Sequence, residues 1–220
     1  ALLAADRSRS VLVIIQGMDA SGKDGTVKHC IGPLNPSAVR VTSFKAPTSR
    51  ELSHDFLWRV HHVCPPKGEF AVFNRSHYED VLIVRVDGLV PKSRWEKRYD
   101  VINAFERNLA DEGTVIIKLL LHMSRDEQAV QLQERLDDPT KNWKYNHDDL
   151  RKREQWDEYQ RAFEVMLERT STPWAPWYVV PADRKWVRNF VVSEILVETL
   201  EALKLTWPTL DDDLRGTRVV

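Results

Sequence analysis

The segment Gly17–Thr26, GMDASGKDGT, combines glycines, a lysine and two aspartates in the spacing of a phosphate-binding loop. Four residues after its first glycine come Gly22 and Lys23, and glycine at such positions lets backbone N–H groups approach a phosphate closely. A serine or threonine that binds Mg²⁺ normally follows this lysine, but here the residue is Asp24, and a second carboxylate, Asp19, lies inside the loop. The other loop residues expected to line a phosphate site are Gly17, Ala20, Ser21, Gly25 and Thr26.

The charges of this loop set a condition on any ligand. Lys23 contributes one positive charge, whereas Asp19 and Asp24 contribute two negative charges, which leaves one net negative charge. Two like charges about 4 Å apart repel by about 4 kcal/mol at an effective dielectric constant of about 20. A phosphate chain therefore needs a cation and basic side chains from elsewhere in the protein.

The two aspartates have different explanations. Asp24 lies in the first turn of the expected helix, where the helix dipole favours a carboxylate that need have no chemical role. Asp19 lies in the middle of the loop with no helix to stabilise, and carboxylates are preferred ligands of Mg²⁺. We therefore expect Asp19 to hold Mg²⁺, directly or through water. The alternative interpretation of the whole segment is a glycine-rich turn without a ligand.

The segment FNRSHYED, which ends at Asp80, follows the third expected strand. In many P-loop enzymes this strand ends in an aspartate that helps hold Mg²⁺, but here it ends in the neutral Asn74. Arg75 comes next, at the edge of the sheet where ligands bind, and is expected to contact phosphate, with a structural ion pair as the alternative. Glu79 is either a site residue or the third residue of a capping box begun by Ser76. Asp80 is a better candidate than Glu79 for binding the metal or orienting the acceptor.

Basic residues gather between Arg135 and Arg153, where six of them face four aspartates, a formal excess of two positive charges. An irregular basic segment between helices is typical of the lid that closes over transferring phosphates in P-loop enzymes. We place this lid at about residues 137–153. A solvated, charged helix end is the alternative for any single lysine. The basic residues are Arg135, Lys141, Lys144, Arg151, Lys152 and Arg153.

Two further observations leave alternatives open. The chain has eight tryptophans, and a nucleobase could stack on one of them, but the sequence does not select which. His61, His62 and Cys64 could ligate zinc, although a single cluster without a partner motif is weak support.

Apolar, β-branched runs alternate with helix-period segments, which predicts a parallel α/β sheet covered by helices on both faces. The S/T-x-x-E spacing at Thr48, Ser76 and Ser124 predicts helix starts with capping boxes. The expected strands are Val11–Gln16, Val39–Phe44, Phe70–Phe73, Val115–His122 and Trp177–Pro181. The expected helices are Thr48–Val63, Ser76–Val86, Lys92–Asp111, Arg125–Leu136, His147–Glu168 and Arg184–Leu205.

The composition is that of an ordinary globular chain forming a single domain over residues 1–220, with 42% hydrophobic and 30% charged residues. With a net charge of −1, any polyanion that the protein binds must be met by a local basic cluster, and no nucleic-acid partner is expected. Two cysteines and no apolar membrane-length run favour a reduced cytoplasmic setting without membrane contact. The start, ALLAAD, is typical of the end of a helix that begins upstream, and DDDLRGTRVV is expected to be a polar tail.

Several long motifs together resemble the polyphosphate kinase 2 family over roughly Val11 to Pro208. They are GMDASGKDGT, VTSFKAPTSREL, HDFLWRVH, FNRSHYEDVLIVRV, LQERLDDPTKNWKY and TSTPWAPWYVVPADRKWVRN. The resemblance implies a P-loop kinase fold similar to thymidylate kinase, with a five-stranded parallel sheet and a helical lid. It also implies phosphoryl transfer between inorganic polyphosphate and nucleotides with Mg²⁺, for which Mn²⁺ is a substitute, and a homodimer or a dimer of dimers.

The resemblance implies roles for the matching positions. Asp19 and Asp80 would handle the metal and the acceptor phosphates, and Lys23 would contact the phosphates in transfer. Arg75 and Arg135 would neutralise these phosphates. The remaining residues expected to contact phosphate or nucleotide are Lys45, Asn74, Glu79, Lys141, Lys144, Arg151 and the loop residues named above.

The expected activity is a polyphosphate-dependent phosphotransferase that makes ADP and ATP from AMP and ADP, reversibly. Asn74, where one branch of the family has aspartate, resembles the class III branch, which accepts both AMP and ADP. An ATP-dependent nucleoside monophosphate kinase on the same fold is the nearest alternative. A regulatory P-loop module with slow chemistry is a more distant one.

Overall fold

The computed structural model describes residues 1–209 of the 220-residue chain, and the expected polar tail lies outside them. Five strands form one sheet in the order β2-β3-β1-β4-β5, and every neighbouring pair is parallel. All five predicted strands are confirmed. Their bounds are β1 Ser10–Gly17, β2 Val39–Ser43, β3 Phe70–Asn74, β4 Thr114–His122 and β5 Trp177–Pro181.

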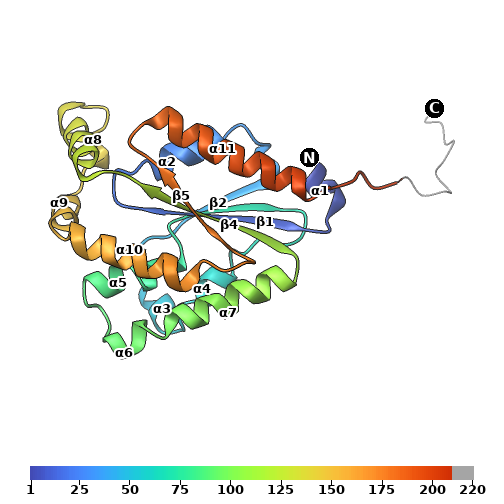
Figure 1. The fold of residues 1–220 in the computed structure, drawn as a ribbon, viewed down its shortest axis with the longest axis horizontal. Coiled ribbons are helices and arrows are strands. Elements are labelled where there is room, and N and C mark those ends of the chain that lie inside the picture. Colours follow the sequence, from blue (N-terminus) through green and yellow to red (C-terminus); the bar gives the residue numbers. More distant parts are fainter. Residues whose placement is uncertain (210–220) are drawn as a thin grey trace.

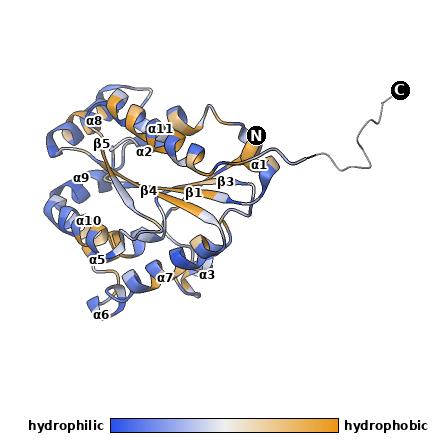
Figure 2. Cartoon of the chain, turned by 45° about the vertical axis from the view of Figure 1, so that its right-hand side comes forward, coloured by the Kyte–Doolittle hydropathy of each residue, from blue (hydrophilic) through white to orange (hydrophobic). Residues whose placement is uncertain are grey.

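The central strand β1 is buried on both faces, because helices cover the sheet on each side (Figure 1). Leu12 and Ile14 pack with buried side chains of α7 (Arg98–Asp111) and α10 (Trp156–Thr170). The alternate residues of the strand, Val11, Val13 and Ile15, pack with Val192 and Leu196 of α11 (Lys185–Ala202) on the opposite face. Figure 2 shows the resulting hydrophobic strands between two helical layers. The predicted fold class is therefore confirmed.

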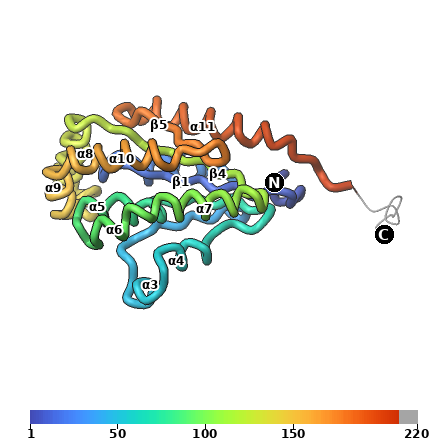
Figure 3. Tube along the Cα trace, turned by 60° about the horizontal axis from the view of Figure 1, so that its bottom comes forward, coloured from blue at the N-terminus to red at the C-terminus, as the bar shows by residue number. Residues whose placement is uncertain are grey.

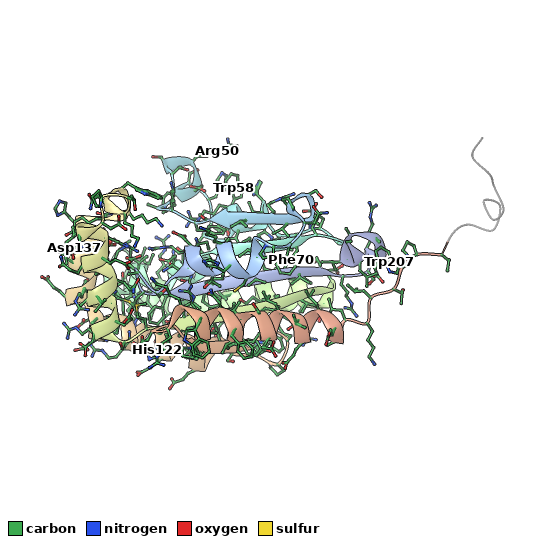
Figure 4. All side chains as sticks on the ribbon, turned by 90° about the horizontal axis from the view of Figure 1, so that it is seen from above. Arg50, Trp58, Phe70, His122, Asp137 and Trp207 are labelled. Carbon is green, nitrogen blue, oxygen red and sulfur yellow. The ribbon has the colours of Figure 1, made fainter. Side chains whose placement is uncertain are left out.

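Several helices expected to be continuous are broken into shorter ones. The segment Thr48–Val63 forms α3 (Ser49–Leu52) and α4 (Trp58–His61), which project from the sheet in Figure 3. The Asp55 carboxylate accepts a hydrogen bond from the Leu57 N–H at 2.9 Å, a local turn that competes with helix formation between them. The capping box of Thr48 and Glu51 is present as predicted. Arg50 and Trp58 mark this projecting segment in Figure 4.

The prediction of a capping box at Ser76 was wrong. The Ser76 hydroxyl accepts from the Tyr78 N–H at 3.2 Å, and a 3₁₀-helix, η3 (His77–Asp80), takes the place of an α-helix start. Arg75 has a left-handed backbone, with φ 61°, which turns the chain sharply as it leaves β3. A short helix α5 (Ile83–Val86) follows.

The remaining expected helices agree with the structure in position and differ in length or continuity. The segment Lys92–Asp111 is divided into α6 (Lys92–Trp95) and α7, and the segment from His147 into α9 (His147–Glu154) and α10. The helix predicted to start after Ser124 is present as α8 (Arg125–Asp137). Other elements are α1 (Leu2–Asp6), α2 (Lys23–Thr26), the π-helical turn η1 (Val27–Ile31), and the 3₁₀ turns η2 (Pro36–Ala38) and η4 (Asn142–Lys144). Every helix within residues 1–209 is too short or too polar to cross a membrane.

A fully buried ion pair joins three elements behind the site. The Lys118 ammonium of β4 donates to the Glu106 carboxylate of α7 at 2.6 Å and to the Thr170 carbonyl of α10 at 2.7 Å. It also donates to the Tyr78 hydroxyl at 2.8 Å, and that hydroxyl donates to Glu106 at 2.8 Å. This network fixes η3, and with it the sharp turn at Arg75, to the sheet and to both covering helices.

Replacing Lys118 by methionine should destabilise the fold strongly, because it leaves the Glu106 carboxylate buried without its cation. We expect a loss of about 3–5 kcal/mol in the free energy of unfolding, measured by urea denaturation. Arg107→Met is the matched control, since its pair with Asp111 is more than half exposed and should contribute less than about 1 kcal/mol. Equal effects of the two substitutions would contradict this reading of the network.

Candidate active site

The phosphate loop connects β1 to α2 and is shaped by close packing. Gly22 has φ 92°, and a Cβ there would lie 1.7 Å from Nη1 of Arg188, a residue of α11. A Cβ on Gly25 would lie 3.0 Å from Nη2 of the same guanidinium. Glycine is favoured at position 22 by its positive φ, and a side chain at either position would displace the guanidinium of Arg188, which lies far away in the sequence.

Lys23 begins α2 at the bottom of the cleft. It is only 8% exposed, and its ammonium donates to the carbonyls of Gly17 at 2.7 Å and Met18 at 2.9 Å. Burial, and then the nearby Arg75 guanidinium, lower the pKa of Lys23 to about 8, against the opposing effect of the surrounding carboxylates. The loop thus holds a positive charge in a place where a polyanion can stabilise it.

The Asp19 carboxylate is held between two cations. Arg75 donates to its Oδ1, and Lys152 of α9 donates to its Oδ2 at 3.0 Å. Gln128 of α8 donates to the Asp19 backbone carbonyl at 3.0 Å. Burial alone would raise the pKa of this carboxyl, but Arg75, followed by Lys23 and Lys152, outweighs burial and holds the pKa well below its usual range. Asp19 is therefore ionised, and its charge is neutralised.

Asp24 faces the end of β3. Its Oδ1 accepts a hydrogen bond from the Asn74 amide at 2.7 Å, so the neutral residue at the strand end is a donor to the loop. Both side chains line the cleft. Arg75 also contacts Glu79 at 3.4 Å, and Glu79 lies outside the lining of this cleft.

The loop opens into a cleft of about 690 Å³ at the carboxyl end of the sheet, covered by α8 and α9. Nine lysine and arginine side chains line it against four carboxylates, a formal excess of five positive charges. They are Lys23 of the loop and Lys45, Arg75, Arg135, Lys141, Lys144, Lys152, Lys185 and Arg188. The basic segment between α8 and α9 therefore does face the phosphate loop, as its charge pattern predicted.

Most of the predicted site residues lie together in this cleft. Ser21, Thr26 and Gly17 are not in its lining: Ser21 and Thr26 are fully buried beneath the loop, and the Thr26 hydroxyl donates to the Gly22 carbonyl at 3.2 Å. The predicted residues that line the cleft are Asp19, Ala20, Gly22, Lys23, Asp24, Gly25, Lys45, Asn74, Arg75, Arg135, Lys141 and Lys144.

Two predicted site residues are paired elsewhere. The Asp80 carboxylate accepts from Arg98 at 2.8 Å, and Asp80 is outside the cleft lining. Arg151 is bonded through two nitrogens to the two carboxylate oxygens of Asp87, at 3.0 Å each, and also lies outside it. Only the fold brings Arg98 to Asp80 and Asp87 to Arg151. Within residues 1–209 no cluster of three or more metal-binding side chains supports the zinc alternative at His61.

The sequence interpretation did not single out Arg188. This residue is 3% exposed, and its Nε and Nη2 donate to the side chain of Asn189, at 3.1 and 2.9 Å. In the part of the chain that the structure describes, it forms no ion pair with a carboxylate, and burial lowers the pKa of its guanidinium. Its position in the motif ADRKWVRN, after the last strand, was the available signal.

Comparison with known proteins decides the family. The family model described as polyphosphate kinase 2 (PPK2) matches residues 3–207. The chain belongs to the polyphosphate kinase 2 family. It is 57% identical over 207 residues to the AMP/ADP-polyphosphate phosphotransferase of Meiothermus ruber, covering 94% of this chain and 78% of that protein. It is 46% identical over 219 residues to the ADP-polyphosphate phosphotransferase of Rhodopseudomonas palustris, covering 94% and 76%.

The fold of this PPK2 chain also matches a solved structure. The crystal structure of polyphosphate kinase 2 from Arthrobacter aurescens TC1 superposes with a TM-score of 0.92 at 47% identity, covering 96% of this chain and 75% of that one. The predicted family and P-loop kinase fold are thus confirmed.

The lowered pKa of Lys23 predicts a pH dependence of polyanion binding. Below pH 7 the ammonium is fully charged, and the charge is lost as the pH rises through about 8. We expect the affinity for tripolyphosphate, measured by calorimetry, to fall about tenfold between about pH 7 and pH 9. In Lys23→Arg the guanidinium stays charged, so this fall should be absent. The same fall in both proteins would assign the titration to another group.

Proposed function

We propose that this protein moves a phosphoryl group from inorganic polyphosphate to AMP and to ADP, giving ADP and ATP in a reversible reaction. The excess of positive charge in the cleft around the phosphate loop carries the proposal. A polyphosphate chain is negatively charged along its length and has no base, so it requires a track of cations and no sequence readout. The name of the Meiothermus ruber relative supports both acceptors.

The residues of the cleft can perform this transfer by positioning and charge neutralisation, which are the main demands of phosphoryl transfer. Lys23, Arg75 and Lys152 surround the Asp19 carboxylate, which would otherwise repel the ligand. The buried Arg188 guanidinium faces the loop from α11, and within residues 1–209 no carboxylate pairs with it. These four cations are fixed by the fold before the phosphates arrive, so little reorganisation is needed at the moment of transfer.

We propose Mg²⁺ as the cofactor, with Mn²⁺ as a substitute, held by Asp19. The donor set fits, because Mg²⁺ in phosphoryl-transfer sites is bound by one or two carboxylates together with substrate phosphates, and Asp19 is an ionised carboxylate in the cleft. When bound, the ion supplies neutralisation of the charge that develops on the transferred group. Both carboxylates are paired with cations, but only Asp19 lines the cleft, so Asp80, which lies outside the lining beside Arg98, fits this role less well.

Three expectations remain predictions. The segment of residues 137–153 is proposed to act as the lid, Asn74 is proposed to mark acceptance of both AMP and ADP, and the active form is proposed to be a homodimer or a dimer of dimers. The first two are consistent with the contacts of Lys152 with Asp19 and of Asn74 with Asp24.

Incubation with AMP, Mg²⁺ and polyphosphate, with no ATP present, tests the proposed activity. We expect ADP and then ATP to form, because the cleft binds a donor without a base. Chromatographic separation of the nucleotides measures both products. Formation of ADP only when ATP replaces polyphosphate would favour the ATP-dependent nucleoside monophosphate kinase instead.

Asp19→Asn tests the metal assignment. We expect the Mg²⁺ concentration for half-maximal activity to rise about tenfold or more, because a ligand charge is removed. Binding of tripolyphosphate without metal should not weaken, since the loop loses one negative charge. Asp111→Asn, a surface carboxylate outside the cleft, is the control. Unchanged Mg²⁺ dependence in Asp19→Asn would overturn the assignment.

A further inference from the structure

The cleft contains a side chain that a purely phosphate-binding site does not need. Trp143, in the turn η4 between α8 and α9, lines the cleft and is 78% exposed. Among the described residues of the lining, it alone has an indole, and His29 has the other aromatic ring. A large apolar ring left open to water in a basic cleft has no role in neutralising phosphates, and it offers a flat surface to an aromatic ligand.

Hydrogen bonds orient the ring relative to its own turn and to α8. Its Nε1–H donates to the Thr140 carbonyl at 3.0 Å. The neighbouring Asn142 amide donates to the carbonyls of Arg135 at 2.8 Å and Leu136 at 2.9 Å, which ties the turn to the last turn of α8. Figure 4 shows Asp137, the last residue of α8, at the end of the molecule opposite Trp207. The hydrogen bonds therefore orient the indole within its turn, which lowers the conformational entropy lost when a base stacks on it.

Positive charge lies immediately beside the ring. The Lys144 ammonium is 5.1 Å from the ring centroid, and Lys141, which lines the same cleft, is paired with Glu134 at 2.5 Å and Asp138 at 3.1 Å. An aromatic ring beside a lysine, in the same cleft as a phosphate loop, matches the chemistry of a nucleotide, which has a flat base at one end and phosphates at the other.

We propose that Trp143 is the platform on which the base of the acceptor nucleotide stacks, with the phosphates extending from it toward Lys23. This inference rests on the proposed function, because it assigns the nucleoside end of the acceptor to η4. The donor polyphosphate then occupies the part of the cleft that has cations and no indole. Stacking uses the π-face, which every base has, so the platform provides affinity for the base and does not by itself distinguish one purine from another.

Calorimetric binding of ADP and of tripolyphosphate to the whole chain, with Mg²⁺ present, tests this assignment. The variants are Trp143→Ala and Trp143→Phe, with Trp186→Ala as the matched control, because Trp186 is a tryptophan 68% exposed on α11 and outside the cleft lining. We expect Trp143→Ala to weaken ADP binding by about 5- to 150-fold, the loss typical of removing the aromatic side chain on which one base stacks. Tripolyphosphate, which has no base, should change by less than about twofold, and Trp143→Phe should retain most of the ADP affinity.

Three outcomes would overturn the platform. The first is an unchanged ADP affinity in Trp143→Ala. The second is an equal loss of ADP and tripolyphosphate affinity, which would mean that the ring only supports the turn. The third is a change of oligomeric state in Trp143→Ala, which would mean that the ring packs against a second copy. Because binding is measured without turnover, the result is separate from the proposed function. If the wild-type protein made no ATP from polyphosphate but Trp143→Ala still lost ADP binding selectively, the proposed activity would be refuted and the stacking role of Trp143 would stand.

Discussion

Repulsion between phosphates and the carboxylates of the loop is the constraint on which the rest of this site depends. Asp19 could not face a polyanion unless its charge were balanced, and the fold balances it with Arg75 from the end of β3 and Lys152 from α9. Because Lys152 comes from 133 residues further along the chain, this ion pair also ties α9 to the loop. The α8–α9 segment must approach the loop closely, and that approach forms the cleft.

Packing behind the cleft makes this balance rigid. Arg75 adopts a left-handed backbone that costs of the order of 1–3 kcal/mol in a non-glycine residue. The conformation is retained because the next three residues, Ser76, His77 and Tyr78, are fully buried, and Tyr78 is bonded to the Lys118–Glu106 pair. On the other side of the loop, Arg188 occupies the space that side chains at Gly22 and Gly25 would need. The cations are thus fixed by the core and do not depend on flexible surface side chains alone.

The same cleft brings together two kinds of surface with different physical roles. Fixed charges suit phosphates of any chain length, whereas the open indole of Trp143 suits a base. A site with both can hold one substrate that is only phosphate and another that ends in a nucleoside. This combination agrees with a transfer between polyphosphate and nucleotides.

The sequence by itself determined the five strands, the phosphate loop, the basic segment and the family, because each is encoded in residues close together in the chain. It also predicted most of the lining, since the ends of parallel strands meet at one edge. Only the tertiary structure decided which charges meet. Asp80 and Arg151 are paired with Arg98 and Asp87 outside the cleft lining, while Arg188 and Lys152 lie inside it. An ion pair depends on distances of a few ångströms between side chains far apart in sequence, and no local pattern specifies those distances.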